Sequence, residues 1–204
     1  MTRRTLLLVR HGQTADNASR VFQGQGGRGL NDEGRRQARQ LAQRLRTAGV
    51  DRVVSSDLER AVETARIVGD LLSLTTETDE ALREVNVGAW TGLSYAQVAE
   101  RFPEEWSAWG AGNDIRRGGG ETYAELALRI EGAVERIAAA GEHETIVVVS
   151  HGAALRSFVC RMLGLPAQGS RVLAGMVNTA ITTITADEHG MRLMSWNDSA
   201  HLGD

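Results

Sequence analysis

Short apolar runs alternate with amphipathic segments along the chain, and this pattern predicts strands that alternate with helices. Two runs are apolar almost throughout, "TLLLVR" (residues 5–10) and "TIVVVS" (residues 145–150), as is typical of strands covered on both faces. The run "DRVVSS" (51–56) predicts another strand, and the tail from about 176 to 196 predicts two more around the turn "DEHG".

Apolar residues at helical spacing predict amphipathic helices between these strands. They are expected at about residues 31–47, 57–72, 121–140 and 153–163, with a shorter helix from about residue 94. Asn31 and Asp57 are suitable N-caps for the first two. Strand–helix alternation implies parallel strands with helices on both faces, so the expected fold is α/β, a three-layer α/β/α sandwich with a mostly parallel central sheet. We expect one domain over residues 1–204.

Candidate chemistry lies where the two apolar strands end. "RHG" (10–12) follows the first strand and "SHG" (150–152) follows the other, so His11 and His151 are expected at the same edge of the sheet. Arg60, in the first turn of a helix, points toward this edge too. With Arg10, these side chains form a cationic pocket that suits a phosphoryl group. An imidazole with one free nitrogen can accept that group, and Glu84 is the candidate proton donor to the leaving group.

Charge and composition limit the alternatives. The formal net charge of −3 argues against a general binder of nucleic acid or anionic membranes, and the apolar run after "MTRR" is too short for a signal peptide. All 23 basic residues are arginine, which points to a bacterial source with a GC-rich genome. The single cysteine, Cys160, is expected to be a buried structural thiol, which fits a cytoplasmic location.

Six segments together resemble the histidine phosphatase superfamily, in its phosphoglycerate-mutase-like branch. They are "LLLVRHGQTADN", "FQGQGGRGLNDEGRRQA", "VVSSDLERAVETA", "LREVNVGAWTGLS", "GGGETYAELALR" and "VVVSHGAALR", in the family's order. The resemblance implies that His11 is the phosphorylated nucleophile, that Arg10, Arg60 and His151 hold the phosphate, and that Glu84 is the proton donor. It also places Asn17, Gln23, Gly24 and Gly152 in the substrate-binding set, and the tail resembles actinobacterial phosphatases such as glucosyl-3-phosphoglycerate phosphatase.

Three other hypotheses stay open at this stage. His11, His151 and Glu84 could form a two-histidine, one-carboxylate metal site, although two arginines beside them would repel the metal; we expect neither metal nor other cofactor. The chain could bind phosphate without catalysis, but such a protein has no need of Glu84. It could also be a mutase. The mutases usually carry an extra segment before the "GGE" motif, and the interval 94–118 is short here, which favours a phosphatase acting on a small phosphate ester.

Two arginines, two tryptophans and three histidines outside these motifs have mainly structural interpretations. Arg116 and Arg117 could hold a second anionic group, but solvated loop charges are the simpler interpretation. Trp106 and Trp109 could cover the pocket, although helix packing is the simpler role. The other histidines, His143, His189 and His201, are expected in surface loops and the tail, and a homodimer is compatible with the sequence.

Overall fold

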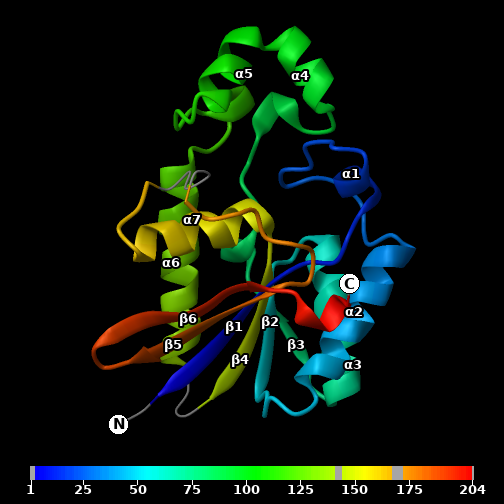
Figure 1. Ribbon diagram of the computed structural model, residues 1–204, viewed down its shortest axis with the longest axis vertical. Helices are drawn as coiled ribbons and strands as arrows, with labels where there is room; N and C mark the ends of the chain where they lie inside the picture. The colour runs from blue at the N-terminus through cyan, green and yellow to red at the C-terminus, as the bar shows by residue number, and fades with distance from the viewer. Residues whose placement is uncertain (1–2, 141–143, 167–171, 204) are drawn as a thin grey trace.

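The computed structural model describes residues 3–140, 144–166 and 172–203, and within them six strands form one sheet (Figure 1). The strands are β1 (Arg4–Arg10), β2 (Arg52–Ser55), β3 (Thr76–Thr78), β4 (Thr145–Ser150), β5 (Ile181–Asp187) and β6 (Gly190–Asp198). Their order is β3-β2-β4-β1-β5-β6; β1 to β4 are parallel, whereas β5 runs antiparallel to both β1 and β6. The mostly parallel sheet is therefore confirmed.

Helices cover both faces of this sheet and also lie beyond the carboxyl ends of its parallel strands (Figure 1). The α-helices are α1 (Ala15–Ala18), α2 (Asp32–Leu45), α3 (Glu59–Leu72), α4 (Tyr95–Arg101), α5 (Pro103–Gly110), α6 (Tyr123–Ala139) and α7 (Gly152–Met162). The pair α2 and α3 packs on one face, and the pair α6 and α7 packs on the other. The predicted three-layer sandwich is confirmed.

Successive residues of β1 explain why the strand is apolar throughout. Leu6 and Leu8 belong to the core beneath α6 and α7, while Leu7 and Val9 belong to the core beneath α2 and α3. Because side chains alternate between the faces of a strand, a sheet covered on both faces needs an apolar residue at every position. Cys160 on α7 is fully buried, as predicted for a structural thiol, and burial raises the pKa of its thiol.

One of the two predicted N-caps is confirmed, and the other is wrong. Asn31 caps α2, with its Oδ1 accepting the N–H of Gly34 at 2.8 Å. The prediction for Asp57 is wrong: Leu58 is the N-cap of α3, and no side chain caps that helix. Asp57 instead accepts a hydrogen bond from Arg83 Nε at 2.8 Å, so an ion pair with a distant segment replaces the local cap.

The sequence pattern did not predict three of the observed elements, namely β3, α1 and α5. Strand β3 is only three residues long and partly exposed, so it carries no apolar run, and α1 is a single turn. Helix α5 starts at Pro103 and carries both predicted packing residues, Trp106 and Trp109, whose ring centroids lie 5.1 Å apart. They pack in an aromatic cluster that also contains Phe22, Trp90, Tyr95 and Phe102. Trp109 also lines a cavity that contains Arg10 and His11.

The two described histidines outside the predicted site lie in a turn and in the tail, as predicted. His189 is exposed in the β5–β6 turn, and His201 lies near Thr179, with Nε2 3.3 Å from its hydroxyl. His143 lies outside the described residues. In the described parts of the chain, no helix is both long and apolar enough to cross a membrane.

Candidate active site

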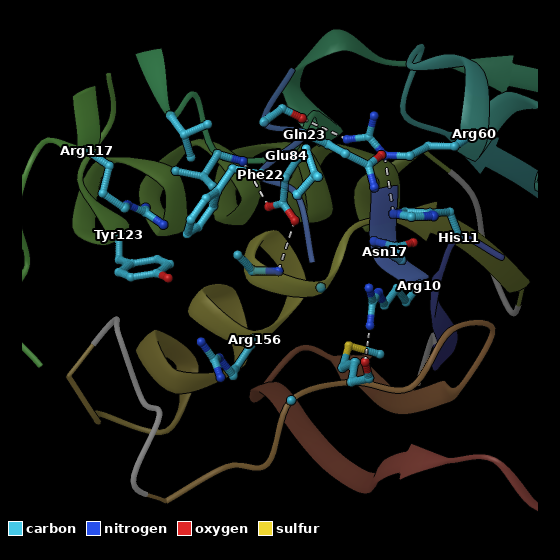
Figure 2. A pocket seen from close by; sticks show the side chains of 18 of the residues that line it. Arg10, His11, Asn17, Phe22, Gln23, Arg60, Glu84, Arg117, Tyr123 and Arg156 are labelled. Atoms are coloured by element: carbon cyan, nitrogen blue, oxygen red, sulfur yellow. Dashed lines mark hydrogen bonds between the residues drawn. The ribbon is translucent and has the colours of Figure 1, made fainter. Parts of the chain in front are cut away.

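A cavity of about 290 Å³ opens where β1 and β4 end (Figure 2). In Figure 1, helices α4 and α5 lie above this end of the sheet. Its lining includes Arg10, His11, Asn17, Phe22, Gln23, Arg60, Glu84, Arg117, Tyr123 and Arg156, which Figure 2 labels. His11, Arg10 and Arg60 lie together at one side of this view, and Arg117, Tyr123 and Arg156 lie at the other, with Glu84 between them. The cavity therefore brings together residues from segments that lie far apart in the sequence.

His11 is held in a defined tautomer. Its Nδ1 lies 2.7 Å from the carbonyl oxygen of Gly12, which can only accept, so Nδ1 carries the proton. Its Nε2 accepts the Arg60 Nε–H at 3.3 Å and therefore has the lone pair. Burial, and then the charges of Arg60 and Arg10, lower the pKa of His11 well below its usual value. His11 is thus a neutral imidazole whose Nε2 is available as a nucleophile.

The backbone around Gly12 supports this tautomer. The N–H of Gly12 donates to Thr64 Oγ1 at 3.0 Å, and the Thr64 hydroxyl donates to the carbonyl of Arg60 at 2.7 Å. Asn178 Nδ2 donates to the carbonyl of His11 at 2.9 Å. These contacts fix the peptide between His11 and Gly12. The next peptide, whose carbonyl orients the His11 ring, is held by the N–H of Gln13, which donates to Gln37 Oε1 at 3.0 Å.

His151 lies beside His11, with ring centroids 5.2 Å apart, as the ends of adjacent parallel strands predict. The side chain is fully buried and its Nε2 lies 2.8 Å from Ser56 Oγ. Burial lowers its pKa well below the usual value, and the nearby Arg60 charge contributes in the same direction. Within the described residues its Nδ1 has no hydrogen-bond partner. A neutral His151 can therefore offer Nδ1 to a ligand while Ser56 holds the other nitrogen.

Arg60 enters the site from the first turn of α3 and is almost fully buried. Besides the contact with His11, its two terminal nitrogens donate to the carbonyls of Gly26 at 2.6 Å and Gly24 at 2.8 Å. Burial lowers the pKa of Arg60 to about 10, so the guanidinium stays charged at neutral pH. Gly24 thus contributes through its carbonyl, in a left-handed conformation (φ 53°) that suits glycine.

Arg10 leaves the end of β1 and donates from Nη1 to the carbonyl of Met176 at 2.5 Å. Its Nε is buried and has no partner among the described residues. Burial lowers its pKa, whereas the Glu84 charge opposes this effect. Gly152 leaves room for this side chain, because a Cβ there would lie 3.3 Å from Arg10 Nε. The free Nε is a donor for an anion in the cavity.

Asn17 and Gln23 are both tied to Thr14. The Thr14 hydroxyl accepts the backbone N–H of Asn17 at 3.1 Å and the side-chain amide of Gln23 at 2.6 Å. Asn17 Oδ1 in turn accepts the N–H of Thr14, which completes a capping box on α1. Both residues line the cavity, and the buried Oε1 of Gln23 has no partner within the described chain.

Glu84 lies in the segment that follows Leu82, and its side chain reaches the N-terminus of α7, with the carboxylate near the centre of the cavity in Figure 2. Oε2 accepts the N–H of Ala153 at 3.2 Å, while Oε1 accepts those of Ala154 at 3.0 Å and Val85 at 2.9 Å. The N–H groups of Ala153 and Ala154 belong to the first turn of α7 and hold the carboxyl group in place. The side chain has one fixed orientation, and Oε2, with a single N–H contact, retains a lone pair that can carry a proton.

Two arginines at the far side of the cavity extend the predicted site. The interpretation of Arg117 as a solvated loop charge is wrong: the side chain is 2% exposed, and its guanidinium carbon lies 3.9 Å from the centroid of the Tyr123 ring. Arg116 fits that interpretation, since it is exposed and pairs with Glu125. Arg156 lines the cavity from α7, and sequence reasoning did not select it. Its position five residues after His151, within "SHGAALR", was the available signal.

The geometry also bears on the metal hypothesis. Among the described residues, no three His, Cys, Asp or Glu side chains are grouped as a metal site requires. Both Glu84 oxygens accept backbone N–H groups, and Arg60 donates to the Nε2 of His11. The arrangement instead offers donors and a nucleophile to an anion.

Comparison with known proteins identifies the family of this chain. The model of the histidine phosphatase superfamily (branch 1) matches residues 6–199. The chain belongs to the histidine phosphatase superfamily. A Yersinia pestis protein named "Probable phosphoglycerate mutase GpmB" is 35% identical to this chain over 96% of the chain and 93% of the relative.

Two solved structures show how closely the fold agrees. Mycobacterial glucosyl-3-phosphoglycerate phosphatase, in complex with VO3, has a TM-score of 0.86 at 32% identity, covering 98% of this chain and 100% of that one. Phosphoserine phosphatase from Entamoeba histolytica has a TM-score of 0.87 at 25% identity, covering 98% and 99%. The phosphoglycerate-mutase-like fold expected from the sequence is therefore confirmed.

Proposed function

We propose that this member of the histidine phosphatase superfamily hydrolyses small phosphate monoesters through a phosphohistidine on Nε2 of His11, with Glu84 as the proton donor. The observation that carries the proposal is the tautomer of His11. Its Nδ1–H is held by the Gly12 carbonyl, and its Nε2 lone pair borders a cavity that also contains Arg10 and Arg60. In this tautomer Nδ1 is held by a hydrogen bond, so the lone pair of Nε2 can attack phosphorus.

In the first step, the Nε2 lone pair of His11 forms a bond to phosphorus while the bond from phosphorus to the ester oxygen breaks. The departing alkoxide takes a proton from Glu84 and leaves as the alcohol, so Glu84 becomes a carboxylate. In the second step, this carboxylate takes a proton from water as the water oxygen attacks phosphorus. The Nε2–P bond breaks, inorganic phosphate leaves, and His11 and protonated Glu84 are restored.

The equatorial oxygens need positive charge in both steps, because negative charge spreads over them in the transition state. Arg10 offers its free Nε, Arg60 is already beside Nε2, and His151 offers Nδ1 when Ser56 O–H donates to its Nε2. Burial makes these interactions stronger than they would be in water. The same groups are the expected binding site of the phosphoryl group in the substrate.

A phosphoglycerate mutase is the second candidate, because the Yersinia relative has that name. The chemistry at His11 would be the same, with a second substrate hydroxyl instead of water as acceptor. Two observations favour hydrolysis. The structures of glucosyl-3-phosphoglycerate phosphatase and phosphoserine phosphatase match this chain over 98% of its length. The segment between Ser94 and Gly118 is also short, and its α-helices are α4 and α5.

Rapid-quench labelling tests the proposal. Wild-type protein mixed with a 32P-labelled monoester should yield acid-labile, base-stable label on the protein, and His11→Ala should yield none. Release of inorganic phosphate into water identifies a phosphatase, whereas isomerised phosphoglycerate identifies a mutase. Label that persists in His11→Ala contradicts the assignment of the nucleophile, and activity that is lost in EDTA and restored by a divalent metal would favour the metal hypothesis.

A further inference from the structure

Arg117 is an unusual side chain for a loop. It is 2% exposed, yet its Nε and Nη2 have no hydrogen-bond partner among the described residues. These two nitrogens form the edge of a guanidinium that binds two oxygens side by side. A buried charged group with unpaired donors is costly to keep, which indicates a partner that enters the cavity with the substrate.

The ring of Tyr123 packs against the guanidinium of Arg117. The Tyr123 ring lies against the guanidinium at 3.9 Å and keeps its orientation, and the Tyr123 hydroxyl accepts the indole N–H of Trp109 at 3.4 Å. Arg156 lies on the same side of the cavity in Figure 2, and its buried Nε is also unpaired within the described chain. Two arginines from different segments therefore have free donors at the same end of one cavity.

The charge of the cavity leads to the same conclusion. Four arginines line it, namely Arg10, Arg60, Arg117 and Arg156, and Glu84 is the single acidic residue in its described lining. The formal excess is three positive charges, or four when Glu84 carries the proton that it donates. A phosphate monoester dianion bound at His11 balances two of them, and a second anionic group on the ligand would balance what remains.

We propose that Arg117 and Arg156 form a second anion subsite, which selects phosphate monoesters that carry a further pair of anionic oxygens, as in a carboxylate or a second phosphoryl group. This inference rests on the proposed function for the position of the first phosphate. Tyr123 acts as a positioning residue, because it touches the guanidinium of Arg117 and holds it toward the cavity.

Matched substrates test the subsite. 3-Phosphoglycerate and glycerol 3-phosphate share the ester but differ in the carboxylate, and propane-1,3-diol bisphosphate supplies a second phosphoryl group instead. We expect wild-type kcat/KM to be about 10- to 100-fold higher for at least one of the doubly anionic esters than for glycerol 3-phosphate, the range for hydrogen bonds to a charged group. Whichever ester is preferred identifies the second group as carboxylate or phosphoryl.

Arg117→Met keeps most of the side-chain volume and should reduce this preference at least tenfold. Arg116→Met is the matched control, since Arg116 is adjacent, exposed and paired with Glu125; it should preserve the preference. Arg156→Met is the second variant, in case Arg117→Met does not fold. Equal kcat/KM values for the three esters in wild-type protein would overturn the subsite, as would an unchanged preference in the folded variants.

Failure of the proposed function gives a different result, namely no turnover of any ester. In that case, calorimetric binding of the same three esters to wild-type protein and to Arg117→Met tests the subsite without chemistry. Tighter binding of a doubly anionic ester that is lost in Arg117→Met supports it, and equal binding of all three contradicts it.

Discussion

Replacing Glu84 by Gln tests the proton donor, and the structure predicts two separable effects. The first is structural. In this variant the new side-chain amide can keep its oxygen toward the N–H groups of Ala154 and Val85, but its nitrogen then faces the Ala153 N–H, which lies 3.2 Å from the present Oε2. One hydrogen bond is lost and two donors meet, which should lower the free energy of unfolding by about 1–3 kcal/mol. In a chain of this size, the melting temperature should fall by roughly 2–10 °C.

The second effect is chemical and depends on the leaving group. An alkyl alkoxide must receive a proton as it leaves, whereas p-nitrophenolate is stable at neutral pH and needs little help. We therefore expect Glu84→Gln to lower kcat/KM for an alkyl phosphate by roughly 10²-fold or more, and for p-nitrophenyl phosphate by less than about tenfold, provided that chemistry limits both reactions. The structural effect alone would reduce both rates equally, so the ratio of the two losses isolates the proton.

Glu80→Gln is the matched control, because Glu80 lies in the same segment but its side chain is 76% exposed and pairs with Arg83 at the surface. It should change neither the melting temperature nor the two rates appreciably. Equal losses on both substrates in Glu84→Gln would refute the role of proton donor and leave Glu84 as a binding residue. No loss on either substrate would remove it from the site.

Three further predictions concern the groups around the phosphoryl position. Ser56→Ala removes the hydroxyl that orients His151 and should lower kcat/KM about 2- to 10-fold, with rescue by Ser56→Thr. Arg60→Lys cannot contact Gly24, Gly26 and His11 together, so kcat/KM and phosphate binding should fall by about 10²-fold or more, as measured by kinetics and calorimetry. Because the folded pKa values of His11 and His151 lie below the unfolded value of about 6.5, the unfolded chain binds more protons, and stability should fall as the pH drops below about 6.5. Urea unfolding at pH 7.5 and pH 5.5 measures this fall, which should be smaller in His11→Asn; a wild-type stability independent of pH in this range would contradict it.

The core of the site could be predicted because it follows from the parallel strands. The apolar runs of β1 and β4 mark both strands in the sequence, and their register pairs Arg10 with Ser150. The residues that follow them, His11 and His151, must then meet at one edge. No knowledge of side-chain contacts is needed for this step, so the sequence was sufficient.

Contacts between distant segments could not be predicted in this way. Asp57 precedes a helix and is a good N-cap by local rules, but Arg83 competes for it from 26 residues away. Likewise, nothing in the composition of "IRRGGGE" distinguishes Arg117 from Arg116, since both are arginines in a polar, glycine-rich loop. Burial of one and exposure of the other depend on how the loop packs.

That packing gives the glycines after Arg117 a physical role. A Cβ at Gly118 would lie 2.6 Å from the carbonyl oxygen of Val87, and one at Gly120 would lie 2.1 Å from that of Asn86. Only glycine permits this approach, because the obstacles are backbone atoms that cannot turn aside. The backbone of residues 118–120 therefore packs directly against the backbone of residues 86–89, which follow Glu84. The proposed proton donor and the proposed second anion subsite are thus held by one backbone contact, so a substrate that binds Arg117 is positioned relative to Glu84 as well.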